Sequence, residues 1–125
     1  MARKIQIEAG SAMLQAELND SDAADAVWKK LPIEGKVTTW GEEIYFDIPV
    51  EMTPGETTTD VNVGTLAYWA PGTAFCIFFG RTPASMSDKP VPASPVAICG
   101  KVIGDTEPLK AIADGEKITL SQAEE

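Results

Sequence analysis

The 125-residue sequence has no histidine, and only ten lysine and arginine residues stand against nineteen aspartate and glutamate residues. The absence of histidine excludes a Ser–His catalytic triad, an imidazole zinc site and an imidazole general base. The formal net charge of −9 argues against nucleic acid or an anionic membrane surface as a partner, because both bind clustered basic side chains. Several common classes of enzyme and binding protein are therefore excluded.

The sequence also lacks an uninterrupted apolar segment. Residues 61–80 carry no charge, but polar residues and Pro71-Gly72 interrupt them, so two strands and a turn are expected in place of a membrane helix. Proline followed by glycine at this position is typical of a type II turn with a positive φ at the glycine. The first residues alternate between apolar and charged, which does not fit a secretory signal, and a cytoplasmic protein is expected.

Cysteine is scarce as well. Cys76 and Cys99 lie far apart in the sequence, each in an apolar run. Two buried thiols are the expected arrangement, and a disulfide is the alternative. Because the sequence has no histidine and no loop with regularly spaced acidic residues, we expect no metal site. Because it has no glycine-rich phosphate-binding loop, we expect no cofactor.

Much of the sequence consists of short segments in which apolar and polar residues alternate. They predict eight strands, at residues 4–9, 14–18, 37–40, 43–48, 66–69, 74–79, 96–103 and 117–121. A helix is expected from Ser21 or Asp22 to Pro32, and a short second helix after Thr106. Eight short strands in a chain with one core favour a single domain over residues 1–125, a closed barrel whose ends the helices cover. Residues 122–125 are expected to form a frayed acidic tail.

One long irregular segment separates two of these strands. Residues 81–95 hold four of the nine prolines and cannot form a central strand, because proline lacks the backbone donor. Long ordered loops in small domains are often functional. The sequence leaves two interpretations of residues 81–95 open, a functional loop and a plain solvated connection.

Several of these segments resemble the cyclophilins. Cys99–Asp105, Leu109–Ile112 and Glu116–Thr119 are similar to a cyclophilin Phe-Gly-Lys-Val strand with the short helix and closing strand that follow it. Gly72–Phe78 resembles the Gly-Ser-Gln-Phe-Phe-Ile strand of the same family. Tyr68–Gly72 with Phe78-Phe79-Gly80 is closer to a compact prokaryotic group of cyclophilin-like proteins whose biochemical role is unassigned. The resemblance implies a mainly β fold, a closed eight-stranded cyclophilin-like barrel with two short capping helices.

The sequence differs from the cyclophilins at the residues with which they catalyse the isomerisation of X-Pro bonds. Those enzymes use an arginine on the strand after the first helix, which weakens the amide resonance that keeps the bond rigid. Here no arginine occurs between Arg3 and Arg81, and Lys36 in the matching region is a point charge, a poor substitute for a guanidinium. The family's tryptophan and histidine have no counterparts in residues 81–95. The resemblance therefore implies a barrel without the isomerase constellation, and we assign no catalytic residue.

By the same match, Cys76 replaces the phenylalanine at the floor of the cyclophilin pocket, and Trp69 replaces a small wall residue. We predict a groove formed by Tyr45, Trp69, Cys76, Phe78 and Arg81, which binds a small apolar molecule or a peptide segment. Two further functions remain open, a weak peptidyl-prolyl isomerase and a homo-oligomer joined through the aromatic face. Equally open is the interpretation in which Trp69 and Phe78 only pack against each other.

Two adjacent carboxylates, Glu42 and Glu43, lie beside the turn at Gly41. Neighbouring residues on a strand point to opposite faces, which separates the two side chains. Carboxylates at turns are usually solvated. A catalytic acid–base pair is therefore not expected here.

Overall fold

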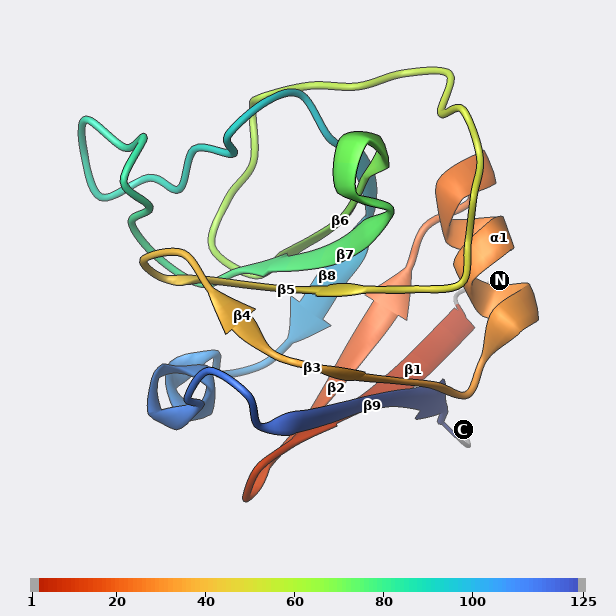
Figure 1. Cartoon of the computed structure of the whole chain (residues 1–125), viewed down its shortest axis with the longest axis horizontal. Helices are drawn as coiled ribbons and strands as arrows, with labels where there is room; N and C mark the ends of the chain where they lie inside the picture. Colours follow the sequence, from red (N-terminus) through yellow and green to blue (C-terminus); the bar gives the residue numbers. More distant parts are fainter. Residues whose placement is uncertain (1–2, 124–125) are drawn as a thin grey trace.

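The computed structural model describes residues 3–123 and shows a mainly β protein (Figure 1). The strands are β1 (Arg3–Ala9), β2 (Ala12–Leu18), β3 (Ile33–Lys36), β4 (Thr38–Thr39), β5 (Glu43–Asp47), β6 (Thr65–Trp69), β7 (Ala74–Phe78), β8 (Ala97–Ile103) and β9 (Lys117–Gln122). One α-helix, α1 (Asp22–Lys30), and two short 3-10 helices, η1 (Ala70–Gly72) and η2 (Glu107–Ala111), complete the fold. The predicted fold class is confirmed, with nine strands in place of eight.

All nine strands form one antiparallel sheet in the order β3-β9-β1-β2-β8-β6-β7-β5-β4. The two edge strands, β3 and β4, are consecutive in the chain and only Val37 separates them. The Val37 N–H donates to the Glu116 carbonyl at 2.9 Å beside β9, whereas β4 pairs with β5. One continuous segment therefore supplies both edges of the sheet, and the sheet nearly closes into a barrel.

The ninth strand, β3, was not predicted because its sequence carries little strand signal. It contains one buried aliphatic residue, Ile33, and a glycine, which weakens a strand. The glycine is needed for packing, since a Cβ on Gly35 would lie 2.7 Å from Cδ2 of Phe46. Pairing of β3 with β9, with Ile33 opposite Leu120, forms this strand despite its weak propensity.

The barrel interior follows the predicted alternation. Ile44 and Phe46 of β5 and Phe75 and Ile77 of β7 are all at most 2% exposed and belong to the main hydrophobic core. The Phe46 and Phe75 rings pack with centroids 5.9 Å apart. Burial of such side chains contributes about 1.5–3 kcal/mol each and drives closure of the barrel.

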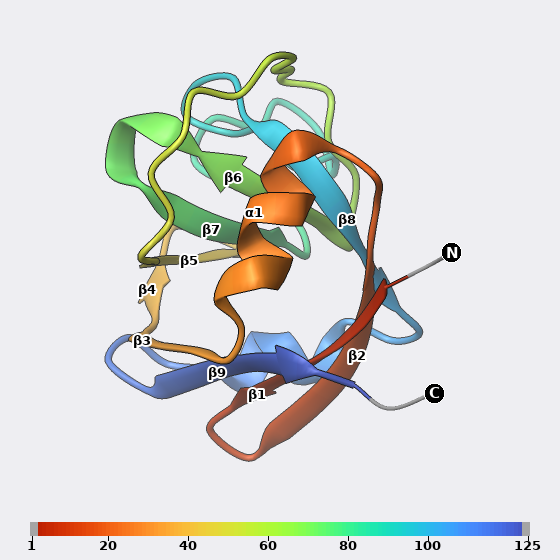
Figure 2. The same ribbon diagram turned by 90° about the vertical axis from the view of Figure 1, so that its right-hand side faces the viewer.

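The two capping helices lie at opposite ends of the barrel (Figures 1 and 2). At one end, Ser21 caps α1 by accepting a hydrogen bond from the Ala24 N–H at 3.2 Å, and Val27 is fully buried. At the other end, η2 buries Leu109. The prediction of two helical caps is confirmed, although the second cap is a 3-10 helix.

Two local predictions are wrong. Residues 70–72 form η1 and the positive φ falls on Thr73, at 48°, so the expected type II turn with a left-handed Gly72 is absent. The expected fraying does not begin at Gln122, because this residue pairs with Ile5 and the Ala123 N–H donates to the Lys4 carbonyl at 2.9 Å. The rest of that predicted tail, residues 124–125, lies outside the described residues.

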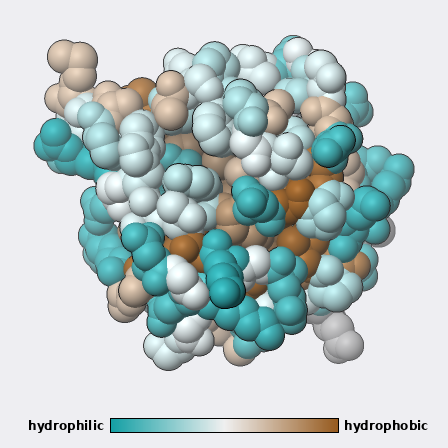
Figure 3. All heavy atoms as spheres, viewed as in Figure 1, coloured by the Kyte–Doolittle hydropathy of each residue, from teal (hydrophilic) through white to brown (hydrophobic). Residues whose placement is uncertain are grey.

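The surface and the thiols agree with the sequence pattern. Hydrophilic residues cover much of the face seen in Figure 3, with apolar atoms visible between them. Within residues 3–123, no helix has the length and hydropathy needed to cross a membrane. Cys76 and Cys99 are both buried free thiols, as expected.

Candidate functional site

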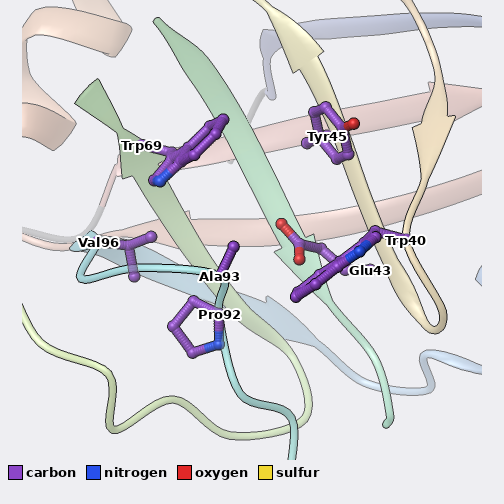
Figure 4. Close-up of a pocket in the computed structure, with 7 residues that line it drawn as sticks. All are labelled: Trp40, Glu43, Tyr45, Trp69, Pro92, Ala93 and Val96. Atoms are coloured by element: carbon purple, nitrogen blue, oxygen red, sulfur yellow. The ribbon is translucent and has the colours of Figure 1, made fainter. Parts of the chain in front are cut away.

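A pocket lies on the outer face of the barrel wall, where the segment after β7 folds back over strands β5 and β6 (Figure 4). Its volume is about 230 Å³. Most of its wall is apolar or aromatic, and its lining residues are Trp40, Glu43, Tyr45, Trp69, Pro92, Ala93 and Val96. The pocket includes two residues of the predicted groove, Tyr45 and Trp69.

Cys76 and Phe78, two other residues of the predicted groove, lie beneath the pocket. Cys76 is 2% exposed and Phe78 is fully buried. They belong to a second hydrophobic cluster, separate from the barrel interior, that also contains Val61, Ala67 and Val96. Tyr45 and Trp69 pack against this cluster. Phe78 and Cys76 therefore support the aromatic wall from behind and do not line the cavity.

The indole of Trp69 is fixed from three sides. Its Nε1–H donates to the Ser94 hydroxyl at 2.7 Å, which connects the barrel wall to the long loop. Its ring meets Tyr45 edge to face, with centroids 6.5 Å apart and an interplanar angle of 69°. The same ring lies over Gly72, where an added Cβ would be 2.6 Å from Cε3 and Cζ3.

We expect Gly72→Ala to displace the Trp69 indole, because the methyl group and the ring cannot occupy the same space. The displacement breaks the hydrogen bond to Ser94, so the indole N–H resonance of Trp69 should shift and broaden in a nitrogen–proton correlation spectrum. The Trp28 resonance, from a residue on α1, serves as the internal control and should not move. An unchanged Trp69 resonance would contradict this packing.

The loop over the pocket, residues 81–95, is held by defined contacts. The buried Thr82 hydroxyl donates to the Val91 carbonyl at 2.5 Å, and Lys89 forms an ion pair with Asp60 of the neighbouring loop. Thr58 and Val96 exchange two backbone hydrogen bonds of 2.8 and 2.9 Å just after the loop ends. These contacts within the protein hold the loop over the pocket, and an ordered loop lowers the entropic cost of binding.

Arg81, the fifth residue of the predicted groove, lies at the base of this loop and is exposed. Its carbonyl accepts from the Glu42 N–H at 2.7 Å, and its own N–H donates to Glu42 Oε1 at 3.3 Å. These contacts connect the loop to the β4–β5 turn. Arg81 does not appear among the residues that line the pocket.

Glu43 is the site residue that the sequence analysis missed. It is only 6% exposed, and its carboxyl group points into the space between Trp40 and Trp69 (Figure 4). Burial raises the pKa of Glu43 to about 7, and a hydrogen bond with the Cys76 thiol acts in the opposite direction. The strand period contained a signal, because Glu43 precedes Tyr45 by two residues and must share its face.

The Cys76 thiol beside Glu43 is poorly suited to nucleophilic chemistry. Burial raises the pKa of Cys76 well above its usual range, and the adjacent carboxylate raises it further. A reactive cysteine needs a low pKa and access to solvent. Cys76 therefore acts here as a buried partner of Glu43.

The chemistry of the lining is restricted. Glu43 and Tyr45 are its ionisable residues, and within the described chain no lysine or arginine belongs to the lining. Residues 3–123 bring together no group of three or more histidine, cysteine, aspartate or glutamate side chains that could hold a metal ion. A larger depression of about 640 Å³, lined by residues 19–23, 54–58 and 97–98, is more polar.

Comparisons with known proteins agree with this fold. The family model described as Cyclophilin-like matches residues 3–121, and the chain belongs to this family. The solution structure of a hypothetical protein from Archaeoglobus fulgidus is similar, with 36% sequence identity and a TM-score of 0.82. That similarity covers 98% of this chain and 95% of the archaeal chain. A search of curated proteins gave no match.

Proposed function

We propose that this protein is a non-catalytic binding module that takes up a small, largely apolar ligand in the pocket over β5, β6 and β7. The observation that supports this proposal is an apolar pocket whose aromatic walls are Trp40, Tyr45 and Trp69, with the Trp69 ring held in place by contacts with Ser94 and Tyr45. Small-molecule sites are typically preformed and mainly apolar, with few polar groups that fix orientation. In this pocket, Glu43 is the polar group that would fix the orientation of the ligand.

The size of the pocket limits the ligand. A volume of about 230 Å³ is below the ~300–1,000 Å³ that usually holds drug-sized molecules. The ligand is therefore a small metabolite or a single side chain presented by a peptide segment. Both belong to the same proposal, since both place one apolar group between the aromatic rings.

The test is calorimetric titration of the protein with a library of small metabolites and short peptides. We expect Trp69→Ala to weaken binding of any hit at least about tenfold, because Trp69 forms a wall of the pocket and truncating an aromatic side chain that contacts a ligand costs more than 1 kcal/mol. Met86→Ala, in the loop of residues 81–95 but 97% exposed and outside the lining, is the control and should bind like the wild type. Equal binding by wild type and Trp69→Ala would refute a function in this pocket.

The alternative, a weak peptidyl-prolyl isomerase, has less support. In the described part of the chain no arginine lines the pocket, and Arg81 is held at the loop base. Adding an Ala-Pro-Phe peptide to the library and following its cis–trans exchange by NMR tests this alternative.

Sedimentation tests the remaining prediction, self-association through the aromatic face, because a dimer that covers Trp69 would be lost in Trp69→Ala.

A further inference from the structure

The aromatic wall and Glu43 together define a more specific ligand chemistry. Trp40, Tyr45 and Trp69 lie around the Glu43 carboxyl group on different sides of the pocket (Figure 4). The faces of aromatic rings carry negative electrostatic potential and attract cations. A carboxylate among such rings adds a full negative charge to the same space.

Among residues 3–123, no lysine or arginine forms an ion pair with Glu43. Its contact is the Cys76 thiol, and within residues 3–123 the pocket lining contains no basic side chain. A buried carboxylate without a counter-ion is costly to ionise. A cation that enters the pocket would supply the missing counter-charge, so the site favours a positively charged ligand.

The walls decide which kind of cation fits. A hydrated metal ion needs several oxygen ligands, whereas this site offers a single carboxylate, and Pro92, Ala93 and Val96 surround it with carbon. An alkylated ammonium group, with its positive charge spread over methyl groups, suits both the apolar walls and the rings. The net charge of −9 attracts such cations from solution.

We propose that the pocket binds a small alkylammonium ion, with the cationic headgroup between Trp40, Tyr45 and Trp69 and in contact with the Glu43 carboxylate. This inference rests on the proposed function and names the ligand class of the same site. It makes Glu43 the residue that determines specificity, because the rings alone would also accept a neutral group of the same shape.

The first test compares choline with 3,3-dimethylbutanol, a neutral molecule of the same shape, by calorimetric titration at pH 8. Choline is expected to bind wild type at least about tenfold more tightly than the neutral analogue, and Glu43→Gln should remove most of this preference, leaving only the smaller contribution of the rings. Equal affinity of both molecules would overturn the cation proposal while leaving the binding function in place. Absence of choline binding into the millimolar range would also overturn it, whatever the library yields.

The second test uses pH. The titratable groups around Glu43 are Cys76 from β7 and Tyr45 from its own strand, while the side chains of residues 92, 93 and 96 carry no titratable group. Because burial raises the pKa of Glu43 to about 7, the ionised fraction of the carboxyl group that binds the cation falls below one half as the pH falls below 7. Choline should bind about tenfold more weakly at pH 6 than at pH 8, since the apparent Kd rises as the competent fraction falls. Glu43→Gln should show no such dependence, and a wild type equally insensitive to pH would contradict the role of Glu43.

Discussion

Gly100→Ala is expected to lower the free energy of unfolding by about 3 kcal/mol or more, which corresponds to a fall in Tm of roughly 10 °C. A Cβ at this position would lie 2.0 Å from the Glu17 carbonyl oxygen and 2.9 Å from the Leu18 Cα. Both atoms belong to the backbone of β2, which pairs with β8 through Leu18 and Gly100. Neither strand can move aside without breaking this part of the sheet.

Thermal unfolding followed by circular dichroism measures this effect. Gly55→Ala is the matched control, because nothing lies within 4 Å of a Cβ at Gly55 and its φ is not positive. The control should differ little from the wild type. If Gly100→Ala unfolds with the Tm of the control, the close approach of β2 and β8 is not required for stability.

The second large effect is a pH-dependent gain in stability in Glu43→Gln. Burial raises the pKa of Glu43 to about 7 from its ordinary value of 4.5, so the folded protein disfavours the ionised form. The stability contributed by protonated Glu43 is fully present below the unfolded-state pKa and is lost as pH rises through the folded-state pKa. The wild type should therefore lose about 2 kcal/mol between pH 5 and pH 8, relative to Glu43→Gln.

Urea unfolding of both proteins at several pH values measures this difference. The difference should develop mainly between pH 4.5 and 7, the interval between the two pKa values. Glu56→Gln, which removes an exposed carboxylate from the loop before β6, controls for the general effect of reducing net charge. Curves for wild type and Glu43→Gln that stay parallel across this range would show that Glu43 titrates normally in the folded protein.

The sequence was sufficient to predict the barrel because its strands alternate in a simple way. Ile44 and Phe46 face inward and Tyr45 faces outward, as the period of two predicts for β5. The same alternation correctly separated Phe75 and Ile77 from Cys76 and Phe78 on β7. Local hydrophobic patterning therefore determines which face of each strand is buried in the barrel.

The pocket was harder to predict because long-range contacts form it. Glu43 looks like a solvated turn residue in the sequence, and it is the return of residues 92–96 over the outer face that encloses it. Phe78 is fully buried although it lies on the outer face of the barrel wall, in a cluster with Val61 and Val96 from distant parts of the chain. No local pattern in a segment rich in proline and serine indicates that it will cover a strand far away in the sequence.

The short link at Val37 has a consequence for the integrity of the barrel. Because β3 and β4 follow each other directly, the chain at Val37 is the covalent link between the two margins of the sheet. Val37 is only 2% exposed, and its N–H and C=O groups are hydrogen-bonded to Glu116 and Gly115. Proteases cleave exposed segments, so this link is protected from cleavage and keeps the two margins of the sheet together.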